Sequence, residues 1–186
     1  MKIFIPDKID YMPQKKIYLA RAGATYSKVL NNEKLMEIAN KIYLHALELV
    51  KPCVYWDIFS REQLSELDIP NRYKDYKEFL IFLSTIGFEI DEEIERLSKN
   101  STLEAALLDA WGSEAIEVLN DNFEKYFKKE YGINLTMRFS PGYEDLDIRR
   151  NKSYVRLLNL EDKITVLESG LIIPRKTTTC IAGIIK

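Results

Sequence analysis

Hydrophobic residues recur along this chain with two different spacings, and the helical spacing is the clearer one. From Glu33 to Val50, apolar residues return every three or four positions, which indicates a helix with one buried face. Asn31-Asn32 precede this segment as capping residues, and Lys51-Pro52 ends it. The same reasoning predicts three further helices, over 91–99, 102–129 and 145–158.

Runs rich in β-branched and aromatic residues predict strands. Two are well defined, Cys53–Phe59 and Glu78–Ser84, and the second is almost continuously apolar. Such a run is typical of a strand that is covered on both faces. Weaker patterns predict strands over 2–5, 133–137, 164–168 and 178–182, with loops over 60–77 and 169–176.

Helices and short strands are mixed along the chain without a regular alternation. There is no Gly/Ser/Pro-rich linker, no repeat, no GxGxxG and no P-loop motif. The sequence therefore predicts one α+β domain over residues 1–186. We expect a central, mostly antiparallel or mixed, twisted sheet with long helices packed on it.

Composition and charge exclude several classes of protein. A net charge of -2 and dispersed Lys and Arg residues argue against binding to nucleic acid or to an anionic membrane. No apolar run approaches the ~20 residues that span a bilayer, and the start lacks a signal-peptide core. Cys53 and Cys180 are far apart and are expected to be reduced. We therefore expect a cytoplasmic protein.

The only histidine, His45, lies within the first long helical pattern. It is better explained by helix packing than by catalysis, so a catalytic triad is not predicted. One histidine and two scattered cysteines also make a zinc site improbable. We expect no metal ligands and no catalytic side chains in this chain.

The segment Arg138-Phe-Ser-Pro-Gly-Tyr143 combines a fixed cation, a rigid turn and an aromatic ring. Arg138 offers planar donors that match a carboxylate. Pro141 fixes φ, Gly142 permits a positive φ or a close approach of ligand to backbone, and Tyr143 offers a stacking face. This set suits a ligand with a carboxylate and a flat ring, whereas an ordinary Pro-Gly surface turn is the alternative.

A second candidate position lies in the middle of the long helix, where small residues surround Glu114. Gly112 lowers helix propensity by about 1 kcal/mol, so it suggests that a ligand or another backbone comes close. Glu114 would then be a partly buried acid facing an ammonium or another cation. The alternative is a helix crossing at Gly112 with Glu114 solvated at its rim.

Taken in order, these segments resemble the activation domain of cobalamin-dependent methionine synthase. The similarity covers nearly the whole chain and is strongest over 78–184. The Arg-x-x-Pro-Gly-Tyr loop is the most specific part. The resemblance rests on Leu83–Gly87, Leu107–Ala115, Arg138–Tyr143, Leu167–Pro174 and Lys176–Gly183.

The resemblance implies a domain that binds S-adenosylmethionine and docks over a cobalamin-binding domain or another corrinoid protein. Reductive methylation then restores the inactive cofactor, with a flavodoxin-like electron donor and with cobalamin supplied by the partner. By motif position, Arg138 would bind the methionine carboxylate. Pro141, Gly142 and Tyr143 would line the adenosine, and Glu114 would face the ligand. The chain would be a component of a methyltransferase system rather than a self-sufficient enzyme.

Some features depart from the family pattern. The sequence stops at Lys186, without the further tyrosine that lies near the ligand in the full-length enzyme. Asp7 and Asp10 are only weak counterparts of an N-terminal acidic contact. An S-adenosylmethionine- or corrinoid-protein-binding module without activation activity is therefore the alternative. An unrelated methyltransferase is disfavoured, because the glycine-rich turn of that class is missing.

Overall fold

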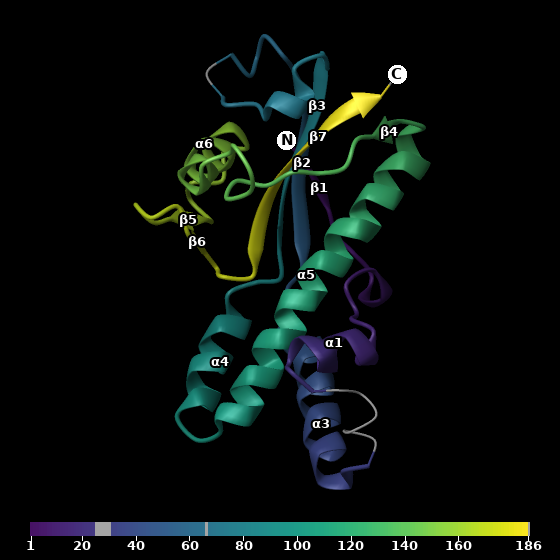
Figure 1. Ribbon diagram of the computed structural model, residues 1–186, viewed down its shortest axis with the longest axis vertical. Coiled ribbons are helices and arrows are strands. Elements are labelled where there is room, and N and C mark those ends of the chain that lie inside the picture. Colours follow the sequence, from purple (N-terminus) through teal and green to yellow (C-terminus); the bar gives the residue numbers. More distant parts are fainter. Residues whose placement is uncertain (25–30, 66, 186) are drawn as a thin grey trace.

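The computed structural model describes residues 1–24, 31–65 and 67–185, and its centre is a five-stranded sheet (Figure 1). The strand order is β1-β2-β3-β7-β4, and every neighbouring pair is antiparallel. Two short strands, β5 and β6, form a separate ribbon. The strands are β1 (Lys2–Phe4), β2 (Cys53–Ser60), β3 (Glu78–Thr85), β4 (Asn134–Leu135), β5 (Thr165–Val166), β6 (Ile172–Ile173) and β7 (Thr177–Ile185).

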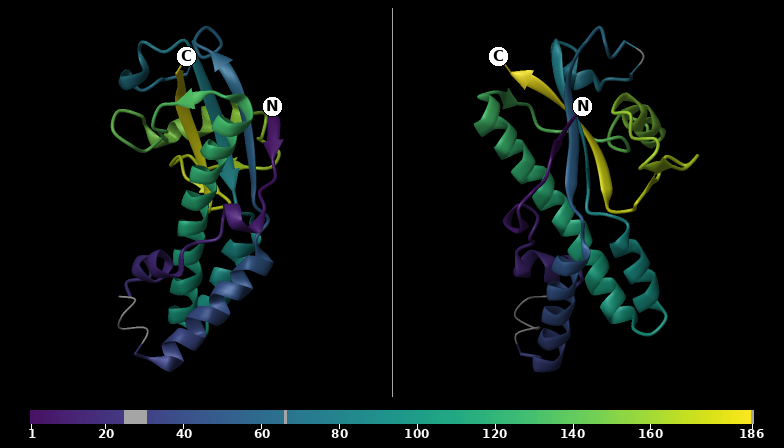
Figure 2. Two further views of the ribbon diagram at one scale, coloured as in Figure 1. Left: turned by 90° about the vertical axis from the view of Figure 1, so that its right-hand side faces the viewer. Right: turned by 180° about the vertical axis from the view of Figure 1, so that it is seen from behind.

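Helices cover both faces of the sheet (Figure 2). The long helix α5 crosses one face, and α1, α3 and α4 pack around its first half. The other face carries α6 and the β5–β6 ribbon. The helices are α1 (Lys15–Arg21), α3 (Glu33–Leu49), α4 (Glu89–Ser98), α5 (Thr102–Tyr131) and α6 (Asn151–Leu157), with 3-10 turns at Lys8–Asp10, Asn71–Tyr73 and Ile148–Arg150.

The central strand β3 explains why there are two cores. Leu80 and Phe82 face the core under α5, whereas Phe79, Ile81 and Leu83 face the core under α6. Side chains alternate between faces along a strand, so one continuous apolar run can serve both cores. The predicted strand covered on both faces and the predicted α+β class with a mostly antiparallel sheet are confirmed.

Local signals at the two ends of α5 have the expected effect. The Ser101 side chain accepts a hydrogen bond from the Glu104 N–H at 3.3 Å, and Gly132 ends the helix with a φ of 66°. Within the described ranges, no helix is both long and apolar enough to cross a membrane.

Several predicted boundaries are wrong. The helix predicted over 145–158 begins only at Asn151, because Asp147 caps a preceding 3-10 turn by accepting the Arg149 N–H at 2.8 Å. The predicted loop 169–176 contains β6, and the predicted strand 133–137 is reduced to β4. Helix α1 has no counterpart among the predicted elements.

Candidate functional site

A cavity of about 680 Å³ lies beside the first half of β7, next to the Arg138 loop. One side is formed by α5 and the other by the segments around Ile148 and Leu171. The lining combines large apolar side chains with threonine, asparagine and arginine. These residues are Arg72, Glu117, Asn120, Met137–Pro141, Tyr143, Glu144, Ile148, Asn151, Leu167, Leu171–Ile173, Arg175 and Thr177–Thr179.

The course of the Arg138 loop creates this space. Phe139 pairs with Ile181 through two main-chain hydrogen bonds of 2.8 Å, so the loop begins as a neighbour of β7. It then turns, with Gly142 at a φ of 101° and its N–H donating to the Leu146 carbonyl at 2.7 Å. This positive φ is the reason for glycine at this position. Pro141 and Tyr143 line the cavity on either side of it.

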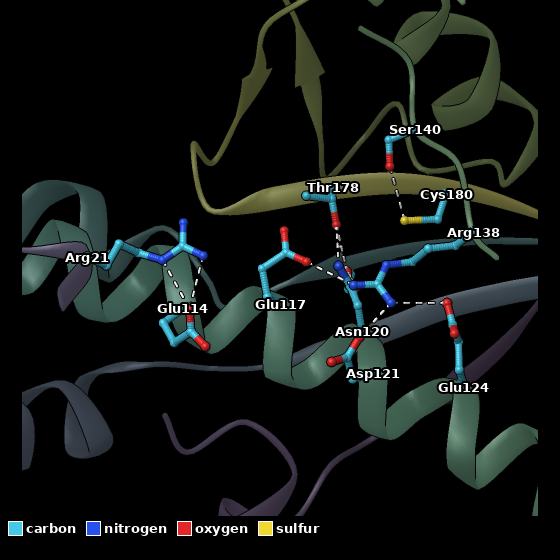
Figure 3. A network of polar contacts seen from close by, with 11 residues as sticks. Arg21, Glu114, Glu117, Asn120, Asp121, Glu124, Arg138, Ser140, Thr178 and Cys180 are labelled. Carbon is cyan, nitrogen blue, oxygen red and sulfur yellow. Dashed lines mark hydrogen bonds and ion pairs between the residues drawn. The ribbon is translucent and has the colours of Figure 1, made fainter. Parts of the chain in front are cut away.

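Arg138 is held by three carboxylates of α5 (Figure 3). Its Nη1 donates to Asp121 at 2.7 Å and to Glu124 at 3.3 Å, and its Nη2 donates to Glu117 at 2.8 Å. These acids recur at intervals of three or four residues, so they lie on one face of the helix. The guanidinium is thus positioned at the cavity wall, but its terminal nitrogens already have carboxylate partners.

The electrostatics of this cluster reflect its partial burial. Burial alone would lower the pKa of Arg138, but the hydrogen bond to Asp121 and the surrounding acidic groups raise it above its ordinary value. Burial raises the pKa of Glu124, and Arg138 only partly offsets this effect. With three carboxyl groups paired to one guanidinium, this wall does not present an excess of positive charge.

Glu114 is buried on α5 but does not line the cavity. It accepts a hydrogen bond from Nε of Arg21 at 3.0 Å and forms an ion pair with Nη2 of the same side chain, also at 3.0 Å. Arg21 belongs to α1 (Figure 3). The structure therefore brings Arg138, Pro141 and Tyr143 together around the cavity, with Gly142 shaping their loop. Glu114 lies nearer the N-terminal end of α5 and is already paired with Arg21.

Gly112 provides space for packing rather than for the cavity. A Cβ atom there would lie 2.8 Å from Ile90 Cδ1 and 3.2 Å from Lys176 Cε. Ile90 belongs to α4, so a helix crossing at Gly112 is supported. The expectation that Glu114 is solvated at the rim of this crossing is wrong, because its side chain is buried against Arg21. Lys176 passes over the same point and donates to Asp109 and Ser113, each at 2.8 Å.

The polar floor of the cavity was not predicted. Asn120 donates to Thr178 at 3.1 Å and accepts a hydrogen bond from Ser84. Thr179 donates to Asn151 at 2.6 Å. The sequence signal is the run of threonines from 177 to 179, which overlaps the strand predicted over 178–182 and belongs to the Lys176–Gly183 segment of the resemblance. Which edge of that strand stays open depends on contacts with distant segments.

The other polar residues considered in the sequence, Asp7, Asp10 and Cys180, do not line the cavity. Asp7 and Asp10 belong to the 3-10 turn near α5. Cys180 is buried beneath Ser140, and burial raises the pKa of its thiol to about 11. Among the described residues, no group of three or more His, Cys, Asp or Glu side chains is placed to hold a metal ion.

Comparisons with known proteins identify the architecture. No family model matches the sequence, and no curated protein sequence matches it significantly. Among solved structures, it is similar to the crystal structure of the MetH reactivation domain bound to AdoHcy, with a TM-score of 0.71 and 13% identity. The match covers 98% of this chain and 77% of that chain. The chain therefore has the fold of the MetH reactivation domain.

Proposed function

We propose that this chain binds S-adenosylmethionine in the cavity beside β7 and supports reductive methylation of the cobalamin of methionine synthase or a related corrinoid protein. One observation carries the proposal. The Arg138–Tyr143 loop lines a cavity of about 680 Å³ in a fold shared with a reactivation domain that was solved with AdoHcy bound.

The cavity has the character of a small-ligand site. Its volume lies within the range of about 300–1,000 Å³ that is usual for such sites. Apolar side chains such as Ile148, Leu171 and Ile172 can cover a purine ring, and Asn120 and Asn151 supply polar groups at fixed positions. A ligand with a purine, a ribose and a charged tail matches this mixture.

The chain's own residues would position the ligand. Arg138 would bind the ligand carboxylate, and the acids around it would attract the ammonium and sulfonium charges. The ligand supplies an activated methyl group, and cobalamin is the partner's cofactor and the methyl acceptor. Alignment and exclusion of water are therefore the contributions required of this protein.

The residues at the mouth of the cavity favour the docking of a partner protein that covers it. Four large apolar side chains at its rim, Met137, Tyr143, Leu167 and Leu171, are between 43% and 70% exposed. Exposed apolar residues that gather in one place mark interaction sites more often than scattered ones do. A corrinoid protein docked here would bring its cofactor to the ligand, with a flavodoxin-like protein as electron donor.

A binding module without activation activity is the second candidate. The observation in its favour is that Arg138 and Glu114 both have strong partners within the chain. A ligand must compete with these ion pairs, so the site could have kept its shape for a different or weaker ligand.

Calorimetric titration with S-adenosylmethionine tests the binding proposal. We expect saturable binding to the wild type. Arg138→Ala should weaken it by about 1.5–3 kcal/mol, or roughly 10- to 150-fold in Kd, because a hydrogen-bonded charge is lost. Arg149→Ala is the matched control, since Arg149 pairs with Asp147 outside the cavity and is highly exposed. Equal affinities for the wild type and Arg138→Ala would contradict the assignment.

A cobalamin absorbance assay separates the two candidate functions. The full chain is mixed with a corrinoid protein, a reductant and S-adenosylmethionine, and the spectrum is followed for methylcobalamin. Formation that depends on both the chain and the ligand supports activation. Ligand binding without such formation, tested across several corrinoid proteins, would favour the binding module.

A further inference from the structure

The main chain of β7 has an open edge at the cavity. In an antiparallel pair, residues alternate between bonding to the neighbouring strand and directing their N–H and C=O to the opposite side. Phe139 bonds to Ile181, and Thr136 bonds to Gly183, both from the side away from β3. Lys176, by contrast, accepts from Ile86 next to β3. Residues 177 and 179 therefore share the outward direction of 181 and 183.

The residues that carry these outward groups are buried, and the groups have no hydrogen-bond partner in the described parts of the chain. Thr177 and Thr179 are 7% and 1% exposed. Among residues 1–24, 31–65 and 67–185, no hydrogen bond reaches the main-chain N–H or C=O of either residue. Their side chains are engaged elsewhere, with Thr85 and Asn151. Buried main-chain groups without partners are rare, so this edge calls for a polar molecule in the cavity.

The geometry of the edge selects a particular pattern of donors and acceptors. The carbonyl of residue 177 and the N–H of residue 179 point to the same side of an extended strand, with one residue between them. An acceptor and a donor side by side match a flat heterocycle that carries an amino group next to an unprotonated ring nitrogen. Adenine has this pattern, whereas hypoxanthine has a carbonyl and an N–H in the same positions.

We propose that the open edge of β7 reads the adenine ring, with the Thr177 carbonyl accepting from the amino group and the Thr179 N–H donating to the adjacent ring nitrogen. The proposal rests on the proposed function and adds the element that recognises the base. Peptides can bind to the edge of a sheet through main-chain hydrogen bonds, and here a small molecule would use the same groups. Ile148 and Leu171 line the same cavity and can pack on the ring faces.

The first experiment compares two ligands that differ only in the base. S-adenosylhomocysteine and S-inosylhomocysteine are titrated calorimetrically into the full chain. The inosine compound places its carbonyl against the Thr177 carbonyl and its N–H against the Thr179 N–H. We expect it to bind at least about 30-fold more weakly, since a site built for hydrogen bonds rejects a ligand that cannot make them.

Amide hydrogen exchange then tests the edge directly, without any substitution. On saturation with S-adenosylhomocysteine, the Thr179 amide should exchange at least about tenfold more slowly. Thr178 is the control, because its N–H already faces β3 and should change little.

Each outcome has a distinct meaning. Equal affinities for the two ligands, or an unprotected Thr179 amide in the saturated complex, would overturn base recognition and leave the proposed function standing. Absence of binding by both ligands at millimolar concentration would remove the proposed function and this proposal together.

Discussion

At the scale of single residues, a comparison of two glycines distinguishes two contributions to stability, the strain of a positive φ and the steric clash of an added Cβ. Gly170 and Gly132 both have a positive φ, 90° and 66°. A Cβ at Gly170 would lie 2.6 Å from the carbonyl carbon of Ile148, whereas a Cβ at Gly132 would meet nothing within 4 Å. Gly170 thus holds the Leu167–Leu171 turn against the segment that forms the cavity wall.

We expect Gly170→Ala to destabilise the protein much more than Gly132→Ala. The conformational penalty should be about 1–2 kcal/mol in both variants. Forced contact with rigid backbone should add roughly 1–3 kcal/mol at Gly170 only. Urea unfolding of the two variants measures the difference. Equal losses of stability would mean that the turn relaxes away from Ile148 at little cost.

At the scale of elements, the start of β7 is fixed to two helices. The Arg175 N–H donates to Asp91 of α4 at 2.6 Å, and Lys176 donates to Asp109 of α5 at 2.8 Å. The two partners in the second pair differ in exposure, since the Lys176 side chain is 10% exposed and that of Asp109 is 51% exposed. Loss of either partner should therefore have unequal effects.

Asp109→Ala should be more destabilising than Lys176→Met. The first change leaves a buried ammonium with Ser113 as its remaining partner, which should cost about 1–3 kcal/mol. The second leaves an exposed carboxylate that water can solvate, and the methionine keeps most of the packing, so we expect less than about 1 kcal/mol. Thermal and urea unfolding both report the order. The reverse order would show that packing of the lysine stem dominates.

The contact between α3 and α4 predicts a dependence of stability on pH. Hydrogen bonds from Arg96 and from His45 lower the pKa of Glu93 to about 2, although burial acts in the opposite direction. Since this pKa lies below the unfolded value of about 4.3, ionised Glu93 stabilises the folded state above that value. This contribution is lost as the pH falls through about 2.

Glu93→Gln should therefore flatten the fall in stability between about pH 4.3 and pH 2. Urea midpoints measured across this window for the wild type and the variant provide the comparison. Other carboxylates titrate in both proteins, so only the difference between the two curves reports on Glu93. Parallel curves would show that this ion pair does not contribute to the pH dependence.

At the scale of the whole molecule, local patterns predicted much of the fold. Periodicity located α3 and α5, and the apolar run of β3 indicated a strand covered on both faces, because these signals lie within the elements themselves. The Arg138–Tyr143 loop likewise indicated part of the cavity wall. Contacts between distant residues were not predictable. Arg21 and Glu114 are 93 positions apart, and the open edge of β7 depends on where the Arg138 loop diverges from it.

The two cores meet at β3, so an experiment can test whether they unfold together or separately. Leu83 lies in the core under α6, whereas Leu80 lies on the opposite face of the same strand. Both tryptophans, Trp56 and Trp111, lie in the core under α5. Tryptophan fluorescence therefore reports on one core, and far-ultraviolet circular dichroism reports on the helices of both.

We expect Leu83→Ala to destabilise the protein by about 2–5 kcal/mol, as usual for a buried leucine. It should lower the urea midpoints from fluorescence and circular dichroism equally, although no tryptophan lies in the altered core. Leu80→Ala removes the same atoms from the core that contains both tryptophans. Its shift in the fluorescence midpoint is the reference against which the shift caused by Leu83→Ala is compared. A fluorescence midpoint that Leu83→Ala leaves unchanged would show that the cores unfold separately. Coincident shifts would show that β3 couples them, so that the cavity wall and the α5 helix share one folding transition.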